Sequence, residues 1–235
     1  MKIIKAYGFS FFFGQAQDFP IEHADPTFYT SCKKTIDALK CSTLIIQEQT
    51  HGTTGMYIDK DQSQQNPLQL KETTGDYLIT NQKGVALGVL TADCLPIVMI
   101  ETRNHIGSIV HAGWKGSLAG ITTKVIEHML QKNFFAPADL HVYFGPCAKS
   151  CCYEVQPEFL YALAEYPWHE RVIEQRNEKL FFNIPLFNKL HLVDLGIDPS
   201  HIHMQYNECT ICNTAYHSNR RNGHARLCQL SVICR

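Results

Sequence analysis

Residues 106–130, IGSIVHAGWKGSLAGITTKVIEHML, change from the spacing of a buried strand to that of an amphipathic helix. Ile106 to His111 is a short apolar run next to glycine, which predicts a buried strand. After Ser117 the apolar residues recur at helical spacing, and they are Leu118, Ile121, Val125, Ile126, Met129 and Leu130. We therefore expect His111 at a strand-to-helix turn, where a scaffold usually presents functional groups.

Segments on either side of this stretch show the same two kinds of pattern. Apolar runs predict strands at Leu44–Ile46, Val85–Leu90, Leu140–Phe144 and His201–Gln205. The amino-terminal MKIIKAYGFSFFFGQ predicts an opening strand rather than a signal peptide. A helix is expected over Pro185–Leu195, because Asn183 stands near the N-cap position and Gly196 follows the last apolar residue. The polar stretch Asp59–Thr74 is expected to be an exposed loop.

Strands and helices alternate loosely along the chain, without an internal repeat or a linker that would separate two halves. This order predicts an α/β fold of the α+β type: a mixed-sheet sandwich with flanking helices, rather than a regular parallel wound sheet. A length of 235 residues suffices for one sizeable core, so we expect a single domain over residues 1–235.

Composition narrows the classes of function. Hydrophobic residues make up 45% of the chain and charged residues 18%, as in a globular protein. The net charge of −1 supplies no field for a phosphate backbone, so nucleic acid is not an expected partner. The most apolar stretch, Val85–Ile100, is interrupted by polar residues and proline, so no membrane span is expected. Ten cysteines in a chain with a good core favour a reducing cytoplasm, where thiols serve as metal ligands or nucleophiles.

Three residues stand at the polar ends of apolar strands: His51 in QTHG, Cys94 in ADCLP and His111 in HAGWKG. Two imidazoles and a thiolate suit a tetrahedral zinc site whose fourth position stays open to water or substrate. Their separations in the sequence are too long for a local ligand motif. Two ordinary turn histidines and a buried thiol therefore stand as the alternative.

Five motifs, QTHG, TADCLPI, HAGWKG, GPCAKSCCYEV and CTICNTAYHSNRRNG, follow one another between residues 47 and 223. In this order they closely resemble the purine nucleoside phosphorylase family with a laccase-type domain, whose members were first labelled multicopper polyphenol oxidoreductases. The resemblance implies a zinc site made by His51, Cys94 and His111. It also implies phosphorolysis of adenosine, inosine, guanosine and methylthioadenosine, and deamination of adenosine, with a purine nucleoside and phosphate as partners.

The residue types fit these reactions. Zinc held by three protein ligands can deprotonate water or hold a phosphate oxygen. Attack of water at C6 of the purine gives deamination, whereas attack of phosphate at the anomeric carbon gives phosphorolysis. Asp93 is the nearest carboxylate to Cys94 in the sequence, and it either acts as an acid or base or makes a structural hydrogen bond.

Positive charge for a phosphate is available near the motifs. Lys115, Arg220 and Arg221 are the candidate contacts, and simple solvation is the alternative for each of them. The aromatic-rich segment usual in the family reads YHSNRR here, so His217 and Asn219 replace side chains on which a base would stack.

Three other interpretations of the chain are possible in chemical terms: a cysteine hydrolase, a multicopper oxidase and a protein with a structural zinc ion. Cys94 as a nucleophile with His111 as its base would make a metal-independent cysteine hydrolase acting on an amide or ester. A multicopper oxidase needs many imidazoles, and the one His-x-His pair, His201–His203, is more simply an edge strand, so copper is disfavoured. A non-enzymatic, structural zinc would need a fourth protein ligand.

The remaining cysteines receive no chemical role from their spacing. Cys209 and Cys212 form a CxxC motif that would need a second pair to bind zinc, and the thiols after it are Cys228 and Cys234, so we expect a structural role. The earlier cysteines are Cys147, Cys151 and Cys152. Because the adjacent pair, Cys151 and Cys152, is not assigned to one metal, we expect packing or incidental oxidation for all three. None of these patterns predicts the oligomeric state.

Overall fold

The computed structural model describes residues 1–19, 26–59, 67–132, 137–223 and 227–235. Most of its strands belong to two six-stranded sheets. The first sheet has the order β1-β2-β15-β7-β3-β5, and its strands are β1 (Ile4–Ala6), β2 (Phe9–Phe13), β3 (Thr43–Glu48), β5 (Leu68–Thr74), β7 (Val85–Thr91) and β15 (Gln229–Cys234). This sheet is mixed, because β3 runs parallel to β5 and β7 while the other neighbours are antiparallel.

The second sheet lies against the first. Its order is β14-β10-β8-β9-β6-β4, and its strands are β4 (Gly55–Ile58), β6 (Tyr77–Thr80), β8 (Leu95–Glu101), β9 (Ile106–Ala112), β10 (Leu140–Phe144) and β14 (Ile202–His203). Phe11 and Leu87 of the first sheet share a buried apolar cluster with Val98 and Ile109 of the second. The alternation of side chains along each strand supplies this inner layer and leaves a second apolar face for helices.

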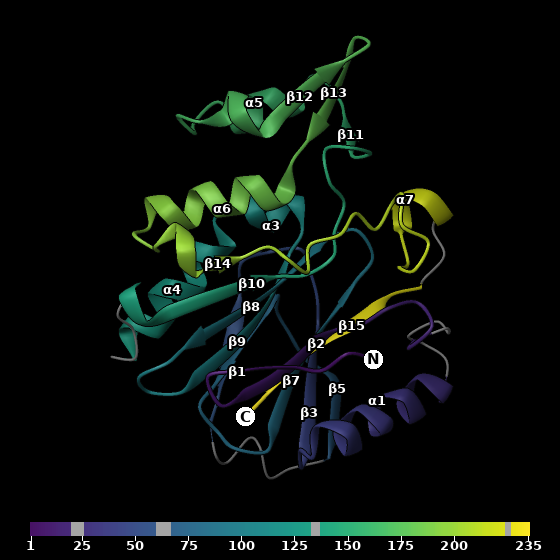
Figure 1. The fold of residues 1–235 in the computed structure, drawn as a ribbon, viewed down its shortest axis with the longest axis vertical. Coiled ribbons are helices and arrows are strands. Elements are labelled where there is room, and N and C mark those ends of the chain that lie inside the picture. Colours follow the sequence, from purple (N-terminus) through teal and green to yellow (C-terminus); the bar gives the residue numbers. More distant parts are fainter. Residues whose placement is uncertain (20–25, 60–66, 133–136, 224–226) are drawn as a thin grey trace.

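Helices cover both outer faces of the sandwich (Figure 1). They are α1 (Pro26–Leu39), α3 (Trp114–Leu118), α4 (Ile121–Gln131), α5 (Phe159–Leu163), α6 (Ile184–Asp194) and α7 (Asn219–Asn222), with 3₁₀ turns at Pro137–Asp139, His169–Val172 and Pro199–His201. Phe28 of α1 is buried with Leu44 of the first sheet, and Val125 of α4 and Phe187 of α6 are buried with the second. Within the described residues, no helix is both long and apolar enough to cross a bilayer.

A small three-stranded sheet lies beyond α6, at the top of Figure 1. Its antiparallel order is β11-β13-β12, with β11 (Glu154–Val155), β12 (Ile173–Arg176) and β13 (Lys179–Phe182). Phe182 is fully buried and its ring centroid lies 5.7 Å from that of Phe187, which anchors the small sheet on α6. The chain enters this sheet directly after Tyr153, which becomes important at the candidate site.

The predicted mixed-sheet sandwich with flanking helices is confirmed. Four of the predicted strands, at Leu44–Ile46, Val85–Leu90, Ile106–His111 and Leu140–Phe144, lie within β3, β7, β9 and β10. The helix predicted over Pro185–Leu195 is α6, whose N-cap Asn183 accepts a hydrogen bond from the backbone of Leu186 at 3.1 Å. The opening segment forms the hairpin β1–β2 rather than one strand.

Three expectations differ from the structure. The stretch Asp59–Thr74 is not all loop, because its last seven residues form β5, an edge strand whose open side tolerates polar residues; residues 60–66 lie outside the described residues. The helix expected from Ser117 is split between α3 and α4, because Gly120 adopts a left-handed φ of 78°. The strand expected over His201–Gln205 shortens to the two-residue edge strand β14.

Candidate metal centre

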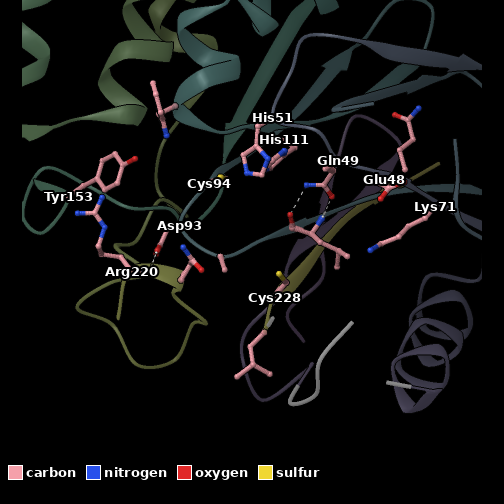
Figure 2. Close-up of a pocket in the computed structure, with 16 residues that line it drawn as sticks. Glu48, Gln49, His51, Lys71, Asp93, Cys94, His111, Tyr153, Arg220 and Cys228 are labelled. Carbon is pink, nitrogen blue, oxygen red and sulfur yellow. Dashed lines mark hydrogen bonds between the residues drawn. The ribbon is translucent and has the colours of Figure 1, made fainter. Parts of the chain in front are cut away.

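The three strand-end residues identified in the sequence come together where the two sheets of the sandwich end. His51 follows β3, Cys94 lies in the bend between β7 and β8, and His111 stands near the end of β9. The atoms of these side chains that could bind a metal all lie within 4.8 Å of one another. Figure 2 shows the three side chains together, with the two imidazole rings next to each other. Three segments that are distant in the sequence therefore supply one candidate centre.

A buried carboxylate stands behind the two histidines. Oδ1 of Asp76 lies 2.8 Å from Nδ1 of His111 and accepts the backbone N–H of His51 at 2.9 Å. The other carboxylate oxygen accepts the backbone N–H of Gly52 at 2.8 Å. Because Nδ1 of His111 is engaged, Nε2 is the nitrogen left for a metal or for Cys94. One carboxylate thus orients the ring of His111 and fixes the backbone that carries His51.

The glycines of HAGWKG allow the backbone to pass close to the donor atoms. A Cβ added at Gly113 would lie 3.0 Å from Sγ of Cys94 and 3.1 Å from Cδ2 of His51. A Cβ added at Gly116 would lie 2.8 Å from the carbonyl oxygen of Gly52. A larger residue at Gly113 would displace Cys94 or His51, and one at Gly116 would displace the backbone of Gly52 next to His51.

The charges of the three side chains set the protonation of the metal-free centre. Burial raises the pKa of the Cys94 thiol, but the charges and hydrogen bonds of His111 and His51 outweigh burial and lower the pKa to about 6. Burial lowers the pKa of His111, whereas the Cys94 thiolate and the Asp76 carboxylate raise it to about 9. At neutral pH the metal-free pair is therefore a thiolate and an imidazolium, and a metal would replace the imidazolium proton.

The donor set fits a zinc ion. Thiolate sulfur and imidazole nitrogen are common zinc ligands, and three protein ligands with one free position are the pattern of catalytic sites. The pairing of His111 with Asp76 is the carboxylate–histidine contact that accompanies zinc ligands. A blue-copper site also uses two histidines and a cysteine, with a weak axial ligand that is usually methionine and sometimes glutamine or a backbone oxygen. Among the lining residues that the structure describes, none is a methionine, whereas Gln47 and Gln49 are present.

The open side of the centre faces a cavity of about 570 Å³, a size within the range of small-molecule sites. In Figure 2, one side of the cavity carries Tyr153, Asp93 and Arg220, and the other carries Gln49, Glu48 and Lys71. Trp114 also lines the cavity. A ligand that reaches the three donors would therefore meet both aromatic rings and positive charge.

Asp93 holds a loop in place. One of its carboxylate oxygens accepts the hydroxyl of Thr210 at 2.6 Å. The other accepts the hydroxyl of Ser218 at 3.1 Å and the backbone N–H of Arg220 at 2.7 Å. With both oxygens engaged in this way, the structure favours a structural hydrogen bond over acid–base chemistry for Asp93.

The three predicted phosphate contacts lie in different environments. Arg220 lines the cavity, and its guanidinium lies 4.9 Å from the ring centre of Tyr153. Arg221 instead donates hydrogen bonds to backbone carbonyls of the loop that precedes it. Lys115 lies against Trp114, with Nζ 5.6 Å from the ring centre. Arg220 is therefore the best placed of the three to contact a ligand.

Sequence reasoning missed several residues that the fold brings to this centre. Lys71 stands in β5, within the stretch expected to be a loop. Asp76 precedes β6, and no neighbour in the sequence marks it as functional. Tyr153 precedes β11 and stands in the GPCAKSCCYEV motif, but no role was assigned to it from the sequence. Only the fold places these three side chains beside the centre.

The segment YHSNRR divides between support and lining. His217 is buried, and its Nε2 lies 2.8 Å from the carbonyl oxygen of Phe19. Asn219 lines the cavity. The aromatic surface that these two positions lack is present in the cavity from Trp114 and Tyr153.

Comparisons with known proteins identify a matching family model and relatives of similar sequence. Residues 29–235 match the family model described as multi-copper polyphenol oxidoreductase laccase. A purine nucleoside phosphorylase of Aquifex aeolicus is 36% identical over 176 residues, which are 75% of this chain and 75% of that protein. Adenosine deaminase RL5, from an unknown prokaryotic organism, is 31% identical over 63% of this chain and 57% of its own length.

Solved structures show the same fold. The crystal structure of the Bacillus licheniformis hypothetical protein YfiH aligns with a TM-score of 0.82 at 21% identity, over 96% of this chain and 92% of that one. The family model covers most of the chain, and the motifs, the sandwich and the relatives agree with it. The chain belongs to the family of the multi-copper polyphenol oxidoreductase laccase domain, among whose relatives are proteins named purine nucleoside phosphorylase.

Proposed function

We propose that this protein is a zinc-dependent purine nucleoside enzyme, which cleaves adenosine, inosine, guanosine and methylthioadenosine with phosphate and deaminates adenosine. The observation that carries the proposal is the centre of His51, Cys94 and His111, which opens into a cavity lined by cations and aromatic rings. The names of the relatives, purine nucleoside phosphorylase and adenosine deaminase, supply the class of substrate, which is a purine nucleoside.

The chain's own residues would divide the work as follows. Bound zinc would supply a Lewis acid that activates water or holds a phosphate oxygen. Asp76 keeps the proton on Nδ1 of His111, so that Nε2 faces the centre. Arg220 and Lys71 are placed to attract the charge of phosphate, since both line the cavity. Trp114 and Tyr153 offer the surfaces on which a purine stacks.

A cysteine hydrolase is the second candidate, and one observation favours it. Asp76, His111 and Cys94 form a line of carboxylate, imidazole and thiol, and the pKa of the thiol falls to about 6 under the influence of His111 and His51, which exceeds the opposing effect of burial. A nucleophile and its base need no second imidazole at the sulfur, however. The presence of His51 beside Cys94 therefore favours the metal enzyme.

Metal analysis followed by turnover tests the proposal. Protein purified without added metal is analysed for zinc, and adenosine turnover is then followed with and without phosphate by measuring adenine, inosine and hypoxanthine. Zinc with phosphate-dependent release of base supports phosphorolysis, and zinc with inosine alone restricts the activity to deamination. No zinc and no turnover, with Cys94 open to alkylation, would replace the proposal with the cysteine hydrolase.

Substitution of one cation separates the two reactions. Arg220→Gln removes a positive charge from the cavity wall, so the KM for phosphate should rise by about tenfold, which is ~1.4 kcal/mol. Adenosine deamination uses water and should change by less than about twofold. Lys124→Gln is the matched control, because Lys124 is an exposed cation paired with Glu127 on α4. Equal losses in both reactions would show that Arg220 acts by holding its loop.

A further inference from the structure

Four cysteine sulfurs gather at a second place in the molecule, outside the cavity described above. Cys151 and Cys152 lie in the turns after β10, and Cys209 and Cys212 lie in the turns after β14. All four sulfur atoms lie within 4.8 Å of one another, and those of Cys151 and Cys212 are 4.0 Å apart. The GPCAKSCCYEV segment therefore brings the CxxC motif the second pair that it would need, although its adjacent cysteines were not assigned to one metal from the sequence.

The spacing of the sulfurs suits one tetrahedral metal ion. Zinc–sulfur bonds of about 2.3 Å place the sulfurs of a tetrahedral site about 3.8 Å apart. The observed limit of 4.8 Å is close to this value, so small rotations of the side chains would complete the site. Four thiolates around one ion are typical of a structural zinc centre.

Backbone hydrogen bonds hold the two turns together independently of the sulfurs. The N–H of Cys147 donates to the carbonyl of Glu208 at 3.0 Å, and the N–H of Thr210 donates to the carbonyl of Cys147 at 3.0 Å. Nζ of Lys149 donates to the carbonyl of Asn207 at 3.0 Å. The scaffold of the cluster is therefore built by main-chain contacts, which preorganise the ligands.

Two cationic side chains contact the turns that carry the cluster. A divalent ion with four thiolates carries a net charge of −2, which needs nearby cations or hydrogen-bond donors. Arg221 donates to the carbonyls of Thr210 and Ile211, inside the CxxC turn, and Arg176 donates to the carbonyl of Ser150 beside Cys151. Two guanidinium groups thus stand at the turns that carry the sulfurs.

We propose that Cys151, Cys152, Cys209 and Cys212 bind a structural zinc ion, separate from the centre of His51, Cys94 and His111. The ion would close a tetrahedral site and cross-link the turn after β10 to the turn after β14. Cys147 stays outside this site, because it is fully buried and its sulfur accepts a hydrogen bond from Asn207 at 3.3 Å.

The cross-link would also stabilise one wall of the cavity. Tyr153 follows Cys152 directly and lines the cavity. Thr210, which lies between Cys209 and Cys212, donates to Asp93, and Asp93 holds the backbone of Arg220. The structural ion would therefore act on the cavity by positioning Tyr153 and Arg220.

Zinc analysis of variants tests the site without reference to nucleoside turnover. After dialysis against a weak chelator, the wild-type protein should hold about two zinc ions per chain, and Cys94→Ser should hold about one. Cys209→Ser combined with Cys212→Ser should lose the other ion. Cys147→Ala is the matched control, a buried cysteine of the same segment, and should keep both ions.

The outcomes separate this inference from the proposed function. Absence of zinc from the Cys94→Ser variant overturns the four-cysteine site, whatever the nucleoside activity of the wild type. If the variant with Cys209→Ser and Cys212→Ser holds no zinc and the wild-type protein does not turn over nucleosides, the proposed function is overturned. The four-cysteine site is then still supported.

A measurement on the wild-type protein guards against a variant that does not fold. Cys151 and Cys212 are exposed, so under alkaline conditions metal-free protein should be alkylated at both, whereas bound zinc should protect them until a strong chelator is added. Peptide mass analysis identifies the modified residues. Alkylation of both thiols without chelator, a Cys151–Cys212 disulfide under reducing conditions, or iron in place of zinc would each overturn the proposal.

Discussion

Two groups of candidate metal ligands differ in their surroundings although they share similar donor atoms. They are the centre of His51, Cys94 and His111 and the cluster of Cys151, Cys152, Cys209 and Cys212. The first takes its donors from the ends of three strands, places Asp76 behind them and leaves a cavity in front. The second takes four sulfurs from two hydrogen-bonded turns. Ligand number and the space beside the ion, rather than the ion itself, separate a catalytic from a structural site.

Removing ligands from each region in turn should produce the largest contrast. Cys94→Ala deletes the thiolate of the three-ligand centre, so zinc at this centre and nucleoside turnover should both be lost. A catalytic metal contributes several kcal/mol to transition-state stabilisation, which corresponds to a loss on the order of 10³-fold in kcat. Steady-state kinetics with adenosine and zinc analysis of the same sample measure both effects.

The comparison depends on the behaviour of the cluster variant in the same assay. Cys209→Ser with Cys212→Ser leaves the three-ligand centre in place, so its kcat should fall by less than about tenfold. A thermal melt of this variant should show a clear loss of stability, because binding of a metal to the native state stabilises it. A Cys94→Ala protein that keeps full turnover would remove the distinction between the two regions.

The carboxylate behind the histidines should give the next largest effect. Asp76→Asn weakens the hold on Nδ1 of His111 and replaces an acceptor of the His51 backbone N–H. Loss of such a supporting carboxylate typically costs 10–100-fold in metal affinity or activity. Zinc affinity measured by competition with a chromophoric chelator should fall by this factor, while the zinc of the cysteine cluster should be unchanged.

A control for Asp76 comes from the other buried carboxylate near the centre. Asp93→Asn weakens the hydrogen bonds that Asp93 accepts from Thr210 and from the backbone of Arg220. It should therefore change the KM for substrate more than the zinc affinity. Equal zinc affinity in the Asp76→Asn protein and the wild type would contradict the role assigned to Asp76.

Thiol reactivity in metal-free protein should separate the two regions by pH. Burial opposes ionisation of Cys94, but His111 and His51 lower its pKa to about 6, so its thiolate is present above that pH and is lost as the pH falls through it. Burial and its cysteine neighbours raise the pKa of Cys151, so that thiol should react only under alkaline conditions. At neutral pH most of Cys94 is thiolate, whereas little of an ordinary thiol is. Because a thiolate of low pKa is also less nucleophilic, we expect Cys94 to be alkylated only about fivefold faster than an ordinary thiol.

The pH profile of alkylation, followed by peptide mass analysis, provides the measurement. His111→Ala is the informative comparison, because loss of the imidazolium should move the midpoint for Cys94 upward toward the ordinary thiol value. A midpoint for Cys94 that stays near 6 in this variant would show that His111 does not set the ionisation of the thiol.

Patterns within short stretches of sequence determined much of the architecture. The strands β7 and β9 and the capped helix α6 were predicted because a continuous apolar run and a helix cap are features of a few neighbouring residues. The candidate ligands His51, Cys94 and His111 were also identified from the sequence, since each stands in a distinctive motif at the end of an apolar strand. Edge strands such as β5 were missed, because their open side does not require apolar residues.

Only the tertiary structure decided which distant groups meet. Asp76 reaches His111 because β6 pairs with β9. Cys151 and Cys152 reach Cys209 and Cys212 because the turns that follow β10 and β14 are joined by backbone hydrogen bonds. Periodicity and capping are local properties of a chain, whereas a ligand set or a supporting carboxylate depends on strand pairing across many residues, which no local pattern encodes.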